Sequence, residues 1–323
     1  MRLRRVKNIA QIAASMDTSA KYQRRFAGFA TFAAIWTYAL IVFGGIVRIT
    51  GSGMGCGDHW PKCNGHWIPP FTIETLIEYT HRVLGVSIGL VLIAVFVYAF
   101  LHRDEPGFSG RGGLLGYAGL VLTLVVVQGL LGAITVWFEI PPEVVVVHFA
   151  NALIIMAILI AAGVKGRALA RAGANTHAVA ADDQNRRGAF IAAAMGFVVV
   201  VFGALVANNL GAPQACQGFP LCNGSVLPSG GGLVHLHWTH RLIAFATVIV
   251  VTYQAVRTWR RGARRSIRSA AAAAAIVAVL QIVVAAGLVM MHLPRELQAL
   301  HLAVGAAVWA TLVFWASVAK YHI

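Results

Sequence analysis

Eight apolar stretches, each long enough to cross a bilayer, fill most of this 323-residue chain. A transmembrane helix needs about 20 consecutive, mostly apolar residues. The composition agrees, because only 11% of the residues are charged, against about 25% in a soluble domain. We therefore predict an all-α integral membrane protein with eight transmembrane helices, at residues 26–48, 75–100, 113–136, 144–166, 188–208, 238–258, 269–291 and 297–319.

The basic residues fall unevenly on the two sides of these predicted helices. Of the 26 lysines and arginines, 21 lie before the first stretch, around the loops after the second, fourth and sixth, or at the C-terminus. This positive-inside pattern places both termini in the cytoplasm of a multi-pass plasma-membrane protein. We interpret the net charge of +15 as topology and contact with anionic membrane lipid, and we expect no nucleic-acid binding.

The chain repeats itself. The segment that begins at Phe43 aligns with the segment that begins at Phe202, an offset of 159 residues, whereas Gln128 and Gln281 are offset by 153. Each copy holds four stretches, an even number, so we expect two pseudo-symmetric four-helix bundles with the same orientation. The predicted parts are a basic N-terminal segment, a first half, a cytoplasmic linker and a second half, at residues 1–25, 26–166, 167–187 and 188–323.

All four cysteines lie in two predicted loops on the non-cytoplasmic side. Disulfides persist on that side of a membrane and are rare in the cytosol. We therefore expect one disulfide within each loop, Cys56–Cys63 and Cys216–Cys222. Free thiols and a metal-binding pair remain alternatives for both loops.

Four of the 12 histidines stand at corresponding positions of the two copies. His81 and His240 lie near the outer end of the second helix of each half, and His148 and His301 near the outer end of the fourth. Ionisable residues inside spans are costly and usually functional. Two histidines on neighbouring helices can hold a haem iron between them, whereas zinc asks for more protein ligands and polar surroundings. We therefore predict one bis-histidine haem site in each half.

Other polar residues recur near these histidines. Arg82 and Arg241 directly follow two of them and either pair with haem propionates or extend to the membrane surface as ordinary helix-end arginines. We interpret Gln128 and Gln281 as hydrogen bonders between helices. Of the remaining histidines, we place His59, His66, His235 and His292 in solvated outer loops, leave His237 unassigned, and place His102, His177 and His322 on the cytoplasmic side.

The two copies differ three residues before the first predicted ligand. The first half has Glu78 and the second has His237. Residues three apart share a helix face, so we expect Glu78 to face the same haem as His81. A carboxylate there can act as a base or stabilise developing positive charge. The alternative is a carboxylate at the interface that pairs with Arg82.

Taken together, these residues resemble the haem A synthase family. The resemblance covers nearly everything after residue 25 and rests on five motifs in order: CGDHWPKCNG at 56–65, EYTHR at 78–82, VVHFANAL at 146–153, HWTHR at 237–241 and HLAVG at 301–305. It implies an oxidoreductase that converts the C8 methyl group of haem O, through a hydroxymethyl stage, to the formyl group of haem A.

The resemblance also implies a role for each half. His81 and His148 would hold the substrate haem, with Glu78 as the functionally important acid, and His240 and His301 would hold a resident haem b. Cys56 and Cys63 match the family's first-loop pair, which we interpret as a structural lid, with a redox-active dithiol as the alternative. The farnesyltransferase that makes haem O is an expected partner, and the electron acceptor and the state of self-association are left open.

Two other functions fit the histidines. A bis-haem b protein that passes electrons from a quinone would need the same four ligands without Glu78. A haem chaperone or transporter would use them to hand haem on. In either case a bound haem would keep its C8 methyl group unchanged.

Overall fold

The computed structural model describes residues 2–70, 72–172 and 183–321 of the chain. Within these residues, eight long helices follow one another, and each is long and apolar enough to cross a membrane. The prediction of an all-α multi-pass membrane protein is confirmed. The elements are α1 (Arg2–Ile49), the short 3-10 helix η1 (Ser52–Met54), α2 (Ile73–Leu101), α3 (Leu114–Trp137), α4 (Pro142–Ala172), α5 (Asp183–Asn208), α6 (Gly232–Arg260), α7 (Arg265–Met290) and α8 (Arg295–Tyr321).

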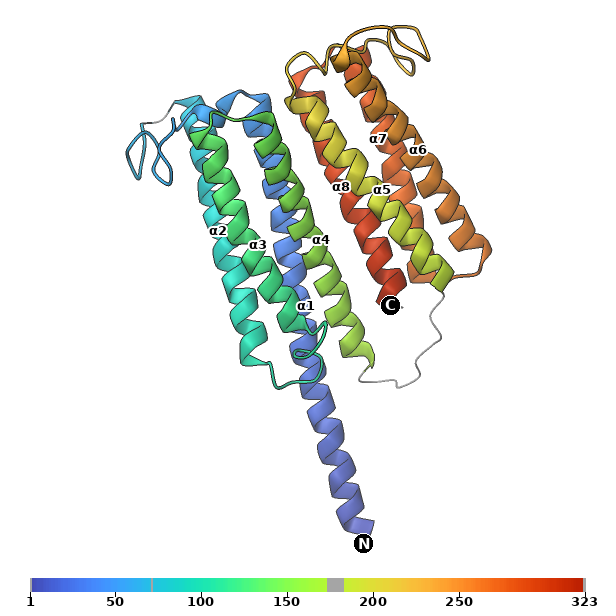
Figure 1. Ribbon diagram of the computed structural model, residues 1–323. Coiled ribbons are helices and arrows are strands. Elements are labelled where there is room, and N and C mark those ends of the chain that lie inside the picture. The colour runs from blue at the N-terminus through green and yellow to red at the C-terminus, as the bar shows by residue number, and fades with distance from the viewer. Residues whose placement is uncertain (1, 71, 173–182, 322–323) are drawn as a thin grey trace.

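The helices form two groups of four that stand side by side (Figure 1). In the first group α1 and α3 each pack against both α2 and α4, and in the second α5 and α7 each pack against both α6 and α8. The groups meet where α8 contacts α1 and α4, and where α4 contacts α5. The loops α1–α2 and α5–α6 lie at one end of the molecule, which we call the loop end, and both termini lie toward the other (Figure 1).

Side chains at the seam between the groups bind backbone carbonyls of the opposite group. Trp309 Nε1 donates to Leu153 O at 2.9 Å, Tyr38 Oη to Ala303 O at 3.0 Å and Arg48 Nη1 to Ala207 O at 2.8 Å. A buried N–H or O–H donor without a partner is costly, so these bonds help to fix the depth of one group against the other.

Several helices extend beyond their predicted limits. The basic segment 1–25 is continuous with the first span, because α1 begins at Arg2. Segment 167–187 is shorter as a linker than predicted, because α4 runs to Ala172 and α5 starts at Asp183, and residues 173–182 lie outside the described part. Counting apolar residues misses such ends, since helices continue with polar residues beyond the hydrocarbon layer.

The α1–α2 and α5–α6 loops are both closed by the predicted disulfides. Cys56 pairs with Cys63 and Cys216 with Cys222, and both pairs are buried. After the first loop, the Thr72 hydroxyl accepts a hydrogen bond from Thr75 N at 3.3 Å and so caps the start of α2. The loops are therefore compact structures attached directly to the helices that carry the predicted histidines.

Candidate functional site

His81 of α2 and His148 of α4 both lie near the loop end of the first group of helices, where these two helices begin. The His81 ring lies parallel to the Phe43 ring at a centroid distance of 6.2 Å and touches α1 at Gly44, where a Cβ would stand only 3.1 Å from Cε1. The Nδ1 atoms of both histidines are buried without a hydrogen-bond partner in the described chain.

His240 of α6 and His301 of α8 stand at the corresponding places in the second group. The His240 ring lies against α5 at Gly203, where a Cβ would stand 2.8 Å from its Cε1, and its buried Nδ1 also lacks a partner in the described residues. His301 differs from the other three histidines. Gln281 Nε2 lies 3.1 Å from His301 Nδ1 and donates to His301 O at 2.9 Å.

These surroundings fit haem as the bound group. Buried polar atoms nearly always have a partner, yet three of the four predicted ligands carry a ring nitrogen with none in the described structure. Each site offers two imidazoles from facing helices, and a haem iron takes one axial nitrogen from each side. The sequence alone pointed to these four residues through the repeat.

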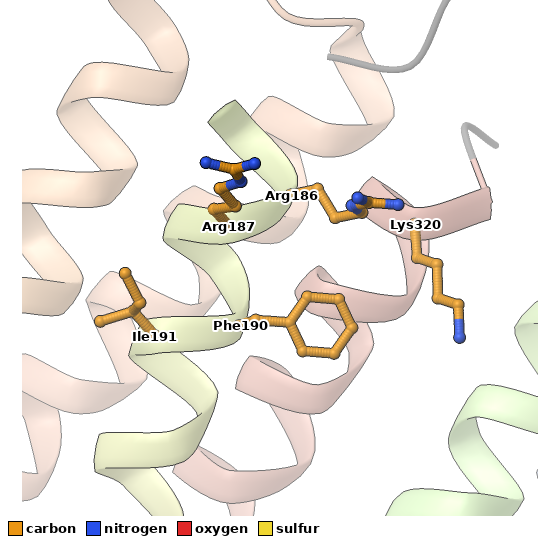
Figure 2. A pocket seen from close by; sticks show the side chains of 5 residues that line it. All are labelled: Arg186, Arg187, Phe190, Ile191 and Lys320. Carbon is orange, nitrogen blue, oxygen red and sulfur yellow. The ribbon is translucent and has the colours of Figure 1, made fainter. Parts of the chain in front are cut away.

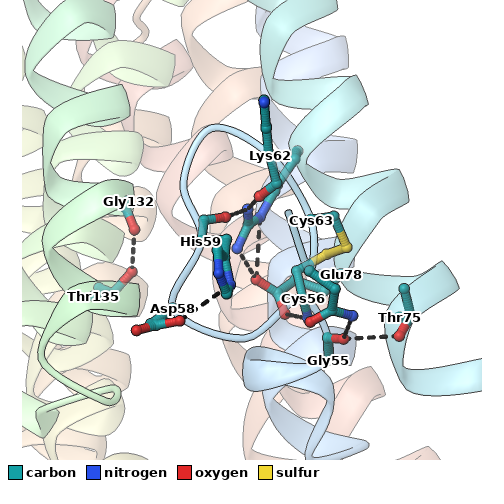
Figure 3. A network of polar contacts seen from close by, with 12 residues as sticks. Gly55, Cys56, Asp58, His59, Lys62, Cys63, Thr75, Glu78, Gly132 and Thr135 are labelled. Carbon is teal, nitrogen blue, oxygen red and sulfur yellow. Dashed lines mark hydrogen bonds and ion pairs between the residues drawn. A yellow bond between two sulfur atoms is a disulfide. The ribbon is translucent and has the colours of Figure 1, made fainter. Parts of the chain in front are cut away.

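Glu78 joins α2 to the first disulfide loop (Figure 3). Its carboxylate is only 4% exposed. Oε2 accepts from the Cys56 backbone N–H at 2.8 Å, and Oε1 accepts from Arg82 Nη2 at 2.6 Å. Arg82 Nη1 in turn donates to His59 O and Lys62 O, at 2.8 and 2.6 Å. The contact with Arg82 is the one foreseen in the alternative interpretation of Glu78, and the bond to the loop was not foreseen.

The corresponding residues of the second half make a different set of contacts. His237 is buried, and its Nδ1 lies 3.0 Å from Ala212 O. Arg241 Nη1 donates to Gly218 O at 2.7 Å and to Leu221 O at 2.8 Å, and Nη2 donates to Cys216 O. Within the described residues no carboxylate lies within ion-pair distance of Arg241. Both arginines therefore tie a helix to its loop, but only Arg82 has an acidic partner.

The remaining predicted positions lie away from these sites. His59, His66 and His292 are exposed in loops as expected, whereas His235 is exposed but lies in the first turn of α6, so its placement in a loop was wrong. The predicted span began at residue 238, too late, because the first turns of α6 contain polar residues. His102 stacks on Tyr98 at the end opposite the loops, and His177 and His322 lie outside the described residues.

Three residues of the sites were not predicted from the sequence. Gly44 and Gly203 match in the repeat, and their close contact with the histidine rings explains why glycine stands in both copies. Asn151, three residues after His148, donates to Gln128 Oε1 at 2.7 Å. The predicted bonding of Gln128 and Gln281 between helices is confirmed, since they bond residues of α4 and α8.

A hollow of about 530 Å³ lies between α5 and α8 near the C-terminal end of the chain. Arg186, Arg187, Phe190, Ile191 and Lys320 line it (Figure 2). A basic rim over apolar side chains suits contact with an anionic membrane surface. It contains none of the predicted site residues, so we assign it no part in the chemistry.

Comparison with known families agrees with this geometry. The family described as cytochrome oxidase assembly protein (COX15-CtaA) matches residues 27–76 and 71–313. The chain belongs to this family. Among its relatives, the protein named Heme A synthase from Symbiobacterium thermophilum is 31% identical over 282 residues, which cover 85% of this chain and 89% of the relative. Heme A synthase from Alkalihalophilus pseudofirmus is 31% identical over 250 residues, or 76% of this chain and 80% of the relative.

Another relative has a different name and length. The protein named Protoheme IX farnesyltransferase from Thermus thermophilus is 40% identical over 144 residues. That region is 42% of this chain but only 23% of the relative. Part of this cytochrome oxidase assembly family member is thus similar to a minor part of a much longer protein.

Proposed function

We propose that this protein is a haem A synthase, an enzyme that oxidises the C8 methyl group of haem O through a hydroxymethyl intermediate to the formyl group of haem A. The observation that carries the proposal is the pair of two-histidine sites, of which only the first has a buried carboxylate, Glu78, three residues before a ligand. The relatives named Heme A synthase, which align over most of the chain, support it.

In this proposal the halves divide the work. His81 and His148 hold the substrate haem O, and the first half, residues 26–166, is catalytic. His240 and His301 hold a resident haem b in the second half, residues 188–323. That haem, when bound, supplies a one-electron carrier. The assignment of halves rests on Glu78, because methyl oxidation releases protons and takes up the oxygen of water, and the second half has no carboxylate at the corresponding position.

Glu78 acts at the mouth of the first site. Its carboxylate is held between Arg82 and the Cys56 N–H, so both of its oxygens stand at fixed places as hydrogen-bond acceptors. A positioned carboxylate can take a proton from water or stabilise positive charge that develops on the substrate. Both disulfides act as structural ties, and the Cys56–Cys63 loop closes the site as a lid, because the same loop supplies the bonds that orient Glu78 and Arg82.

The arginines differ in their suitability for a haem propionate. Arg241 is buried and pairs only with carbonyls in the described structure, so a propionate would supply the carboxylate that it lacks. Arg82 already has Glu78 as its partner. We therefore propose Arg241 as the stronger propionate ligand and Arg82 as one that shares its charge with Glu78.

The proposed topology follows from the sequence. The two bundles are related by an axis along the membrane normal, both termini are cytoplasmic, and the loop end faces the other side. Membrane lipid surrounds the chain, and the electron acceptor is a further partner. The long Thermus relative named Protoheme IX farnesyltransferase supports a functional link with the enzyme that makes haem O. Small residues on the lipid-facing surface also permit a homo-oligomer in the membrane.

Chromatography of extracted haem tests the function. The protein is purified from cells that also produce haem O, and its haem is extracted and separated. Haem B together with haem O, its hydroxymethyl form or haem A is expected for a synthase with a resident cofactor. Haem B alone, at two per chain and unchanged by a supply of haem O, would contradict the proposal and make the protein an electron-transfer protein.

A further inference from the structure

The glutamine of the third helix bonds a different partner in each half. In the second half, Gln281 lies beside the ring of His301 and also donates to its backbone carbonyl. In the first half, Gln128 Oε1 accepts from Asn151 Nδ2 at 2.7 Å, and the buried Nδ1 of His148 has no partner in the described residues. The side chains of the equivalent glutamines thus differ, because that of Gln281 bonds a histidine ring and that of Gln128 bonds Asn151.

A single methyl group accounts for part of this difference. A Cβ at Gly305 would stand 3.3 Å from Gln281 Nε2, which is closer than the usual contact distance between non-bonded heavy atoms. The corresponding residue of the first half is Ala152, which carries that Cβ. The space that Gln281 uses beside α8 is therefore reduced for Gln128 beside α4.

The neighbouring residue completes the difference. Asn151 is buried and offers Gln128 an amide partner on α4. Its counterpart at the offset of 153 is Val304, which has no polar group. Since a buried amide is costly without a partner, Gln281 can satisfy itself only at His301 and its backbone, whereas Gln128 can satisfy itself at Asn151.

A hydrogen bond to the ring of a metal-ligating histidine fixes its orientation and strengthens the ligand. Gln281 can give this support to either tautomer of His301, because an amide has both donors and an acceptor, and its Oε1 has no other partner in the described chain. In the described residues the Gln128 side chain gives His148 no such bond, because it bonds Asn151 instead. The His148 ring lies against α3 at Gly132.

We propose that Asn151 is a positioning residue that holds Gln128 away from His148, so that the first site exchanges its haem while the second retains it. This inference rests on the proposed function, in which substrate must enter the first half and product must leave it. A haem that stays bound as a cofactor needs a ligating histidine whose ring is fixed by a hydrogen bond. A haem that is exchanged needs a histidine from which it dissociates more easily.

The test transfers the second half's arrangement to the first. The full-length variant carries Asn151→Val with Ala152→Gly, and it is purified with haem O and haem B bound. Excess apomyoglobin is added as a haem acceptor, and the haem left on the protein is extracted and separated over time. Release of haem O should slow about tenfold, the lower end of the effect of outer-shell partners on metal sites, while release of haem B is unchanged.

Three controls separate positioning from a general change in stability. Ala152→Gly alone keeps Asn151 and should release haem O at the wild-type rate. Gln128→Leu added to the double variant removes the amide and should restore fast release. The mirror variant, Val304→Asn with Gly305→Ala, should speed the release of haem B and leave that of haem O unchanged.

The outcomes also separate this inference from the proposed function. Haem O bound to every variant but released at one common rate would overturn the role of Asn151 and leave the synthase intact. Equal slowing by Ala152→Gly alone would assign the effect to space and also overturn it. Wild-type protein that never binds haem O would refute the proposed function, and this inference would fall with it.

Discussion

The two halves of this chain hold the arginine that follows the ligand of the second helix in two ways. Arg82 forms an ion pair with Glu78 at 2.6 Å, and Arg241 is surrounded by loop carbonyls with His237 beside it at the position of the carboxylate. Burying a charge without partners is costly, and each half satisfies that requirement with its own loop. The fold therefore does not require Glu78, because the second half keeps helix and loop together without an acid.

That comparison separates structural roles from chemical ones. A residue whose counterpart does the same work in both halves, such as an arginine that binds loop carbonyls, is explained by structure. A residue present in one half only needs another reason. Glu78 and Asn151 are such residues, and both lie within one turn of a predicted ligand of the first half.

The largest expected effect comes from the histidines themselves. His81→Ala or His148→Ala should abolish haem A formation and remove bound haem O, because the first site loses an axial ligand. The b-type absorption spectrum should persist from the second half. His240→Ala or His301→Ala should instead remove haem B. Optical spectra and extracted haem measure both, with His66→Ala in the exposed outer loop as the control. Loss of the b-type spectrum only in the first pair would reverse the assignment of the halves.

The next largest effect should come from exchanging Glu78 and His237, which differ between the two halves. Glu78→His gives the first half the residue of the second, so Arg82 can keep its loop carbonyls as Arg241 does. Turnover of haem O should fall by roughly 10²–10⁴, the usual contribution of a general acid or base. The content of both haems should stay near that of the wild type.

The reciprocal variant sharpens this result. His237→Glu places a carboxylate beside Arg241, so it should compete with a propionate for that arginine and lower the content of haem B, while haem O stays bound to the first half. Thermal unfolding and alkylation of free thiols check that the loops remain closed in both variants. A Glu78→His enzyme with full turnover would show that the carboxylate is only a tie between α2 and its loop.

Much of this architecture could be predicted from the sequence. The eight spans follow from their length and apolar composition, and the paired histidines follow from the repeat, because four equivalent positions are strong evidence where one is weak. The disulfides were expected from the predicted position of the loops on the non-cytoplasmic side. These features depend on composition and spacing, which a sequence displays directly.

The contacts of the site could not be predicted in the same way. Glu78 and Arg82 stand four residues apart on a helix, so their pairing was open to inference, but the bond from Glu78 to the Cys56 N–H depends on how a loop folds back. The difference between Asn151 and Val304 is visible in the repeat. The space beside Gly305, which gives that difference its meaning, exists only once α7 and α8 are packed.

The smallest expected effect tests the glycines that face the ligands in both halves. A Cβ at Gly203 would stand 2.8 Å from His240 Cε1, and one at Gly44 would stand 3.1 Å from His81 Cε1. Each ring must turn to accept the methyl group, and a turned ring is a poorer ligand. We expect Gly203→Ala to lower affinity for haem B about tenfold and Gly44→Ala to lower affinity for haem O by less, since its contact is less severe.

Gly28→Ala is the matched control, because it lies in α1 with nothing within 4 Å of the new Cβ. It should raise helix stability by up to about 1 kcal/mol, since alanine favours a helix more than glycine does, and leave both haems bound. Haem titration followed by absorption spectroscopy measures the affinities. If both glycine variants bound haem like the control, the rings would have room to move, and the close contacts on α1 and α5 would have no part in fixing the ligands. If each variant lost only the haem of its own half, the two sites would be independent, although the same repeat builds them.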